Sequence, residues 1–125
     1  MIKLVYCVRR REDVSPEDFH DYWLNTHGPN VRSVAEKINA LRYVQSHTFG
    51  HESNTAIRDS RNMAAPYDGI TEVWFRDEAH MNAAGLTEEG KEAGRFLIED
   101  EARFIDLQRS TAFITEEHEI FDLQA

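Results

Sequence analysis

Residues 15–29, SPEDFHDYWLNTHGP, carry the signals that decide the fold, because they mark the start and the expected end of a helix. Ser15 suits the N-cap position, Pro16 suits the first helical position, and two acidic residues follow in the first turn. Aromatic side chains then recur at helical spacing as far as His27, where a Gly-Pro pair predicts the end of the helix. We therefore expect a helix over residues 16–27 that ends on an imidazole.

The remaining elements alternate around this helix. Runs of β-branched and aromatic residues predict four strands, at residues 2–8, 41–49, 69–75 and 107–115. Helical spacing predicts three further helices, over residues 31–38, near residues 76–84 and after a capping Thr87. The resulting order, β-α-β-β-α-β, is that of the ferredoxin-like sandwich, an α+β fold with four antiparallel strands and helices on one face of the sheet.

The length of 125 residues suits a single domain, which we place at residues 1–115. Residues 50–68 have no clear periodicity, so we expect a long loop there. Such a loop in a compact domain is usually functional or disordered. The acidic residues 116–125 follow the last strand as a tail.

The composition excludes several classes of function. The formal charge is −9, with 23 acidic and 14 basic residues, and this argues against binding to nucleic acid or to an anionic membrane. No segment has the pattern of a signal peptide or the length of a membrane span, so the cytoplasm is the expected location. Cys7 is the only cysteine, which rules out an intrachain disulfide and a cysteine-based zinc cluster.

One face of the predicted sheet has no helices to cover it. With a period of two, Tyr43, Gln45 and His47 share one side of the second strand, and Glu72 and Trp74 share one side of the third. Aromatic rings beside titratable groups suit a semi-polar cavity better than a core. Because a large mixed patch is seldom left exposed, we expect a second copy of the chain to close this face, giving a homodimer.

The motifs SPEDFHDYWLNTHGP, ALRYVQSH and PYDGITEVWF, in this order and at these separations, resemble the EthD family of the dimeric α/β-barrel superfamily. The resemblance covers almost the whole chain. It implies a ferredoxin-like protomer, a homodimer, and no firmly attached metal or organic cofactor. The family takes its name from a gene cluster for ether degradation in which a cytochrome P450 system performs the oxidation. An oxygenase system is therefore an implied partner.

Similar barrels include lactone isomerases of aromatic catabolism, polyketide cyclases and dehydratases, and antibiotic-biosynthesis monooxygenases, and some relatives bind haem. In the isomerase branch, a histidine at the position that matches His27 lies in the cavity. That branch also has a second histidine before a Pro-Tyr pair and a cysteine before the strand tryptophan. Here Met63-Ala64-Ala65 and Val73 stand at those places, which argues against an identical isomerase reaction.

His27 has two interpretations. At a helix C-terminus the macrodipole favours the imidazolium, whereas burial beside Phe19 and Trp23 favours the neutral ring, and together these effects can set the pKa near neutrality for a general acid or base. Alternatively, the imidazole caps the helix by donating a hydrogen bond to an unsatisfied carbonyl.

We predict His27, Tyr43 and Glu72 as catalytic residues that face one another across a cavity. Glu72 is costly inside a strand unless it is paired, and its alternative role is an ion pair with Arg42 or Arg109. The side chains expected to bind the substrate are Tyr6, Trp23, Gln45, His47, Tyr67 and Trp74, and an exposed polar edge is the alternative for the second strand. No histidine pair has the i, i+4 spacing of a helical metal site, so no metal is predicted.

These features favour a cofactor-independent enzyme of the isomerase, cyclase or dehydratase type that acts on a small, largely apolar oxygenated compound. Proton transfer and loss of water need only acid-base groups. A rival hypothesis is an accessory or binding protein for an oxygenase in the breakdown of ethers or aromatic compounds. A second rival is a monooxygenase-like oxidoreductase without a bound cofactor.

Overall fold

A computed structural model describes residues 1–124. Its strands form one antiparallel sheet in the order β2-β3-β1-β4: β1 (Ile2–Val8), β2 (Arg42–His47), β3 (Gly69–Phe75) and β4 (Thr111–Glu116). The α-helices are α1 (Pro16–Tyr22), α2 (Gly28–Val34), α3 (His51–Arg61), α4 (Glu78–Ala83) and α5 (Glu88–Glu101). A π-helical turn spans Trp23–His27, and 3-10 turns span Ala84–Leu86 and Leu107–Arg109.

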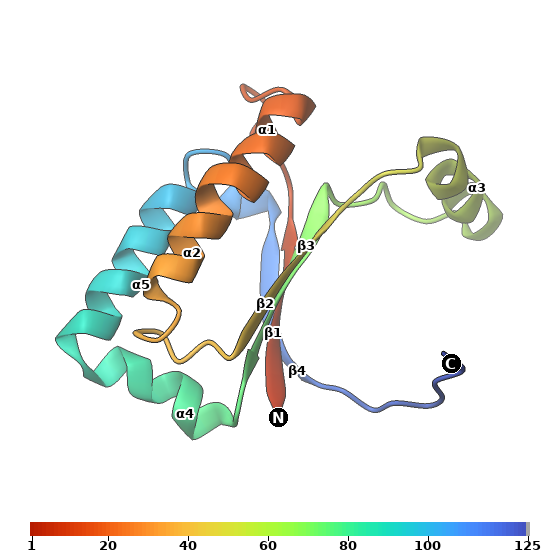
Figure 1. Ribbon diagram of the computed structural model, residues 1–125. Coiled ribbons are helices and arrows are strands. Elements are labelled where there is room, and N and C mark those ends of the chain that lie inside the picture. The colour runs from red at the N-terminus through yellow and green to blue at the C-terminus, as the bar shows by residue number, and fades with distance from the viewer. Residues whose placement is uncertain (125) are drawn as a thin grey trace.

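Figure 1 shows α1, α2, α4 and α5 on one side of the sheet, and α3 with the C-terminal tail on the other. The ferredoxin-like α+β fold predicted from the sequence is confirmed. In the described part of the chain, no helix has both the length and the apolar character needed to cross a membrane.

Residues 51–61 form the helix α3, where the sequence predicted a loop. The helix lies between two residues with left-handed backbone conformation, Gly50 (φ 74°) and Asn62 (φ 52°). None of its residues is buried. Its sequence, HESNTAIRDSR, has only two apolar residues, Ala56 and Ile57, so it lacks the apolar stripe on which a sequence-based assignment depends.

The helix that begins at Pro16 does not end at His27. Gly28 has helical dihedrals (φ −54°, ψ −54°), and its N–H donates to the carbonyl of Trp23, five residues earlier, so the π-helical turn leads directly into α2. Proline has no N–H group to donate a helical hydrogen bond, and its ring normally clashes with the preceding turn of a regular α-helix. The wider π-helical turn relieves this clash at Pro29. The interpretation of His27 as a C-terminal cap, with its imidazolium favoured by the helix dipole, is therefore wrong.

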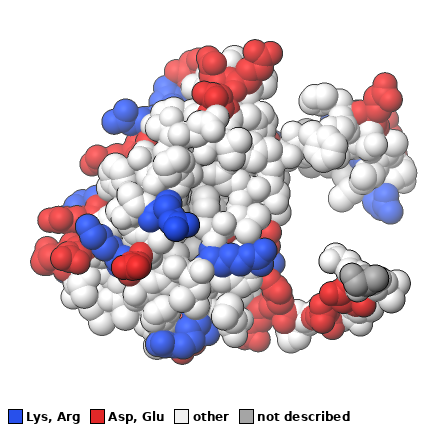
Figure 2. All heavy atoms as spheres, in the orientation of Figure 1, with Lys and Arg blue, Asp and Glu red and all other residues white. Residues whose placement is uncertain are grey.

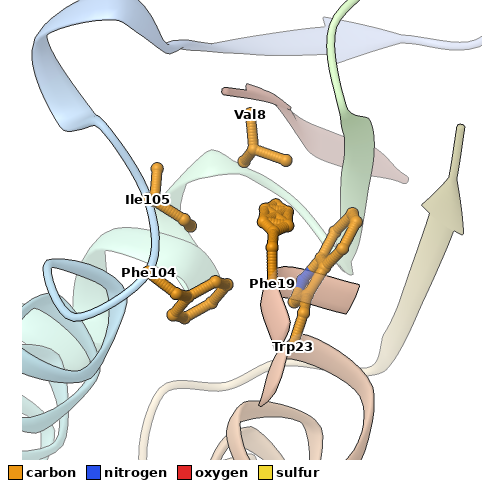
Figure 3. Close-up of a cluster of buried hydrophobic side chains, with 5 residues drawn as sticks. All are labelled: Val8, Phe19, Trp23, Phe104 and Ile105. Atoms are coloured by element: carbon orange, nitrogen blue, oxygen red, sulfur yellow. The ribbon is translucent and has the colours of Figure 1, made fainter. Parts of the chain in front are cut away.

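The core lies where the first helix crosses the sheet and meets the end of α5. Its buried side chains, drawn in Figure 3, are Val8, Phe19, Trp23, Phe104 and Ile105. Phe19 makes edge-to-face contacts with Trp23 and Phe104, at ring-centroid distances of 5.4 and 5.5 Å. The outer edge of the Trp23 ring also contacts β3 at Gly69, where there is no room for a side chain. A Cβ atom there would be 2.5 Å from ring carbon Cζ3 of Trp23.

The space around two glycines predicts opposite effects for their substitution by alanine. Gly69→Ala should lower the free energy of unfolding by about 2–3 kcal/mol, because the methyl group displaces the Trp23 ring or the strand. Gly94→Ala, in α5, is the control: an added Cβ there meets no atom within 4 Å. It should raise stability by about 0.5–1 kcal/mol through helix propensity. Chemical denaturation measures both, and an unchanged stability for Gly69→Ala would contradict the close packing.

Candidate active site

A cavity of about 230 Å³ lies between the sheet and the helices that cover it. Most of its wall is aliphatic or aromatic and includes Trp23. The polar side chains in the wall are Tyr6 from β1, His27 from the π-helical turn, Tyr43 from β2, Thr71 from β3 and Glu101 from α5. A small apolar cavity with a few convergent polar groups has the general character of a ligand site.

His27 is bonded to a buried carboxylate. Its Nδ1 lies 2.6 Å from Oδ2 of Asp100, and the two residues are only 4% and 5% exposed. Asp100 also accepts hydrogen bonds from the hydroxyl of Tyr22 and from Nδ2 of Asn30, the latter at 3.0 Å. Burial alone would raise the pKa of Asp100, but the donors outweigh it and the pKa is lowered. The group therefore remains a carboxylate near neutral pH.

This pairing determines which nitrogen of His27 is available for chemistry. An ionised carboxylate can only accept, so Nδ1 carries the proton and Nε2 holds the free lone pair. Within residues 1–124, no hydrogen-bond partner is found for Nε2. Burial lowers the pKa of His27, and the hydrogen bond and charge of Asp100 oppose the shift only in part. The ring is therefore neutral near pH 7 and can accept a proton from a group in the cavity.

Glu101 is a second titratable group in the cavity wall. The hydroxyl of Tyr6 donates to its Oε1 at 3.2 Å. Burial raises the pKa of Glu101 to about 7; the hydrogen bond from Tyr6 opposes this shift and the negative charge of Asp100 adds to it. A carboxyl group with this pKa is partly protonated near neutral pH and can donate a proton. Burial also raises the pKa of Tyr6 and that of Tyr43, so both phenols remain neutral donors.

Gln45 and His47 do not line the cavity, but Gln45 contacts Tyr43, which does. Gln45 Nε2 donates to the hydroxyl oxygen of Tyr43 at 2.9 Å and to the carbonyl of Trp23 at 2.8 Å. Its Oε1 is 2.7 Å from Nε2 of His47, whose Nδ1 is 2.8 Å from Nδ1 of His20. Because Tyr43 accepts from Gln45, its own O–H remains available to a ligand.

The expectation that the cavity lies on the face of the sheet without helices is wrong, because Tyr43 lines a cavity on the helix-covered face. Glu72 and Trp74 lie on the opposite face of the sheet from this cavity. Tyr43 is paired with Val73 across the β2–β3 ladder, so the residues on either side of Val73 point away from Tyr43. The expected partnership of Glu72 with His27 and Tyr43 is therefore wrong. Glu72 forms an ion pair with Lys3 at 2.5 Å, rather than with Arg42 or Arg109.

Of the residues predicted to bind the substrate, some therefore line the cavity and others do not. Tyr6 and Trp23 line the cavity together with the predicted catalytic residues His27 and Tyr43. Trp74 donates from Nε1 to Glu117 at 3.0 Å on the open face of the sheet. Tyr67 lies under the guanidinium of Arg9, 4.1 Å from its ring centre, and does not line the cavity.

Sequence reasoning missed Asp100 and Glu101 as functional residues. Asp100 falls on the stripe that Ala93, Leu97 and Phe104 mark at helical spacing along α5 and beyond it. An acidic residue on the buried stripe of a helix is costly unless it is satisfied, and this was the available signal. Within residues 1–124, no group of three or more His, Cys, Asp or Glu side chains is arranged to hold a metal ion.

Several known proteins share this architecture. An ethyl tert-butyl ether D (EthD) family protein from Bacillus halodurans C-125 is 23% identical, with a TM-score of 0.63 over 94% of this chain and 99% of its own. HapK from Hahella chejuensis is 14% identical, with a TM-score of 0.59 over 100% and 99% of the two chains. A dimeric protein of unknown function and ferredoxin-like fold from Bacteroides fragilis NCTC 9343 is 12% identical, with a TM-score of 0.58 over 93% and 95%.

None of the curated proteins matches the sequence. The family model of the EthD domain matches residues 11–108, a range that includes His27, Asp100 and Glu101. The match extends over more than half of the chain, and the fold agrees with that of the Bacillus halodurans family member. This chain belongs to the EthD domain family.

Proposed function

We propose that this protein is a cofactor-independent enzyme that moves protons on a small, largely apolar carbonyl compound. The observation that carries the proposal is the buried His27–Asp100 pair at the wall of an apolar cavity. A buried carboxylate that orients a neutral imidazole is the arrangement that a general base requires. Glu101 and Tyr43 add proton donors on the same side of the sheet.

In this mechanism, Nε2 of His27 removes a proton from the carbon next to the carbonyl group. The electron pair of the broken C–H bond moves onto the carbonyl oxygen, which a hydrogen bond from Glu101 or Tyr43 stabilises. Asp100 stabilises the imidazolium that forms. Return of the proton to another carbon completes an isomerisation. Loss of a β-hydroxyl group as water, with a proton from Glu101, completes a dehydration.

Substitutions of the pair test this proposal. The assay is a panel of lactones, β-diketones that can cyclise and β-hydroxy ketones, followed by chromatography. His27→Gln should lower turnover by roughly two to four orders of magnitude, the usual contribution of a positioned general base. Asp100→Asn should also lower it strongly, because an amide no longer fixes the tautomer. His51→Gln, on the exposed helix α3, is the matched control and should retain full activity.

Other outcomes of this assay separate the rival functions. Binding without turnover would support an accessory protein for an oxygenase in ether or aromatic breakdown, and oxygen consumption would support a monooxygenase-like oxidoreductase. Full turnover in His27→Gln would contradict the role of the pair.

The raised pKa of Glu101 predicts a dependence of stability on pH that needs no substrate. Because the folded-state pKa of about 7 exceeds the ordinary value of 4.5, the folded protein binds more protons than the unfolded chain between these values. This group therefore loses its contribution to stability as pH rises from 4.5 through 7. Glu101→Gln removes the effect. The melting temperature of the variant relative to wild type should rise over this interval by roughly 4–10 °C. A difference independent of pH would contradict a raised pKa.

We also propose that the protein is a homodimer whose open sheet faces pack together. This face carries Val5 from β1 and Phe113 from β4, which is 48% exposed. In Figure 1, α3 and the C-terminal tail extend from the same side of the sheet, and the space-filling view in Figure 2 shows an open gap between these two extensions. Their vicinity has further exposed apolar side chains: Phe49, Ile57, Met63, Ile120, Phe121 and Leu123. An isolated helix of 11 residues is marginal in water, and α3 buries none of its residues, so a partner surface would account for its stability.

Light scattering on two variants tests the dimer. Phe113→Arg places a charge on the proposed interface and should give a monomer at micromolar concentration. Ile98→Arg, on the outer surface of α5, changes an equally apolar and 59% exposed side chain and should leave the dimer intact. A monomeric wild-type protein, or a dimer that Phe113→Arg does not weaken, would contradict this interface.

A further inference from the structure

The cavity is too small to enclose a ligand of ordinary size. Its volume of about 230 Å³ is below the ~300–1,000 Å³ of typical small-molecule sites. Val31 of α2 and Tyr43 of β2 also line a second, larger groove of about 910 Å³. This groove lies between α2 and β2, which is an edge strand of the sheet. These two side chains therefore form the boundary between the cavity and the groove, and a substrate larger than the cavity would have to pass them to reach the groove.

The two compartments differ in charge. Among residues 1–124, no Lys or Arg side chain lines the cavity, where Glu101 is in the wall and Asp100 is bonded to His27. Of the described residues that line the groove, three are basic, Arg32, Lys37 and Arg42, and one is acidic, Glu36. This is the reverse of the balance in the whole chain, where 23 acidic residues exceed 14 basic ones. Figure 2 shows Lys and Arg side chains over the face formed by α2 and β2, with most Asp and Glu side chains toward the rim.

Two of these cations are available to a ligand. Within residues 1–124, neither Arg32 nor Lys37 takes part in an ion pair, and both are exposed. Arg42 differs, because its guanidinium stacks over the ring of Trp74 at 4.4 Å, toward the open face of the sheet. The positive charge that the groove offers to a ligand is thus mainly that of Arg32 and Lys37.

We propose that the substrate has two parts: an apolar, carbonyl-bearing part that enters the cavity, and an anionic group that remains in the groove beside Arg32 and Lys37. This inference rests on the proposed function for the reacting end. A carboxylate or phosphate inside the cavity would be buried without a cation, next to two acidic residues, and that is strongly unfavourable. The same anion in the groove meets exposed cations at little desolvation cost. The charge contrast therefore also sets which end of the substrate reaches His27.

The anion can come from two sources with the same chemistry. One is the carboxylate of a free amphiphilic acid. The other is the phosphate of a carrier, such as coenzyme A, that holds an acyl group through a thioester. In both cases a short linker must pass Val31 and Tyr43.

A matched set of probes tests the proposal by isothermal titration calorimetry at low salt. The probes are 3-(2-naphthoyl)propionate, its uncharged methyl ester and its coenzyme A thioester, which share one aromatic ketone. The wild-type protein should bind the acid or the thioester about tenfold more tightly than the methyl ester. The double variant Arg32→Glu/Lys37→Glu should lose this preference and bind the methyl ester as before. Lys91→Glu/Arg95→Glu, which makes the same change of charge on α5, should keep the preference.

The outcomes distinguish a free acid from a phosphorylated carrier, and they test the binding groove separately from the proposed proton-transfer chemistry. Tightest binding of the thioester identifies a phosphorylated carrier, and tightest binding of the acid identifies a free acid. Equal affinities for charged and uncharged probes, no binding of any probe, or an equal loss in the control variant would overturn the inference. His27→Gln should keep the preference for charged probes. A preserved preference in a protein that turns over no substrate would refute the proposed chemistry and leave the binding groove standing.

Discussion

The buried carboxylate of Asp100 is the constraint on which the site and the helix layer depend. A carboxylate that is 5% exposed is tolerated only when donors satisfy it. Asp100, in α5, receives hydrogen bonds from Tyr22 in α1, His27 in the π-helical turn and Asn30 in α2. These bonds tie the first helical segment to the last helix at one point. The contact that stabilises the helix layer therefore also fixes the orientation and tautomer of His27.

The π-helical turn is what makes this arrangement possible. Tyr22 and His27 are five residues apart, a spacing that places two side chains on different sides of a regular α-helix with 3.6 residues per turn. The i→i+5 bond between Trp23 and Gly28 widens the turn and brings both side chains to Asp100. Gln45 donates to the same Trp23 carbonyl and thereby supports the turn from β2. The Gly28-Pro29 pair, which suggested the end of a helix, thus follows the turn that places His27 beside Asp100.

The antiparallel sheet separates two sets of residues that alternate along its strands. On the face covered by helices, Tyr6 and Tyr43 meet His27 around the cavity. On the other face, Lys3 pairs with Glu72, and Phe113 is exposed. Acid-base chemistry and association with a second copy are therefore proposed for opposite faces of the same strands. The groove between α2 and β2 adds the positive charge that the interior of the cavity lacks.

The sequence by itself determined that there are four strands within residues 1–124, their order of connection and the family, because periodicity and capping are local signals. It placed the start of the last strand too early, since Leu107–Arg109 form a 3-10 turn and β4 begins at Thr111. It also pointed to four residues that line the cavity, Tyr6, Trp23, His27 and Tyr43, since aromatic and titratable residues in regular elements are conspicuous. Only the tertiary structure decided which face of each strand is covered, because a shift of one residue in register reverses every side chain. It alone joined Asp100 to His27, 73 positions away in the chain. Such a pairing depends on how α5 packs against the first helix, and no local pattern records that contact.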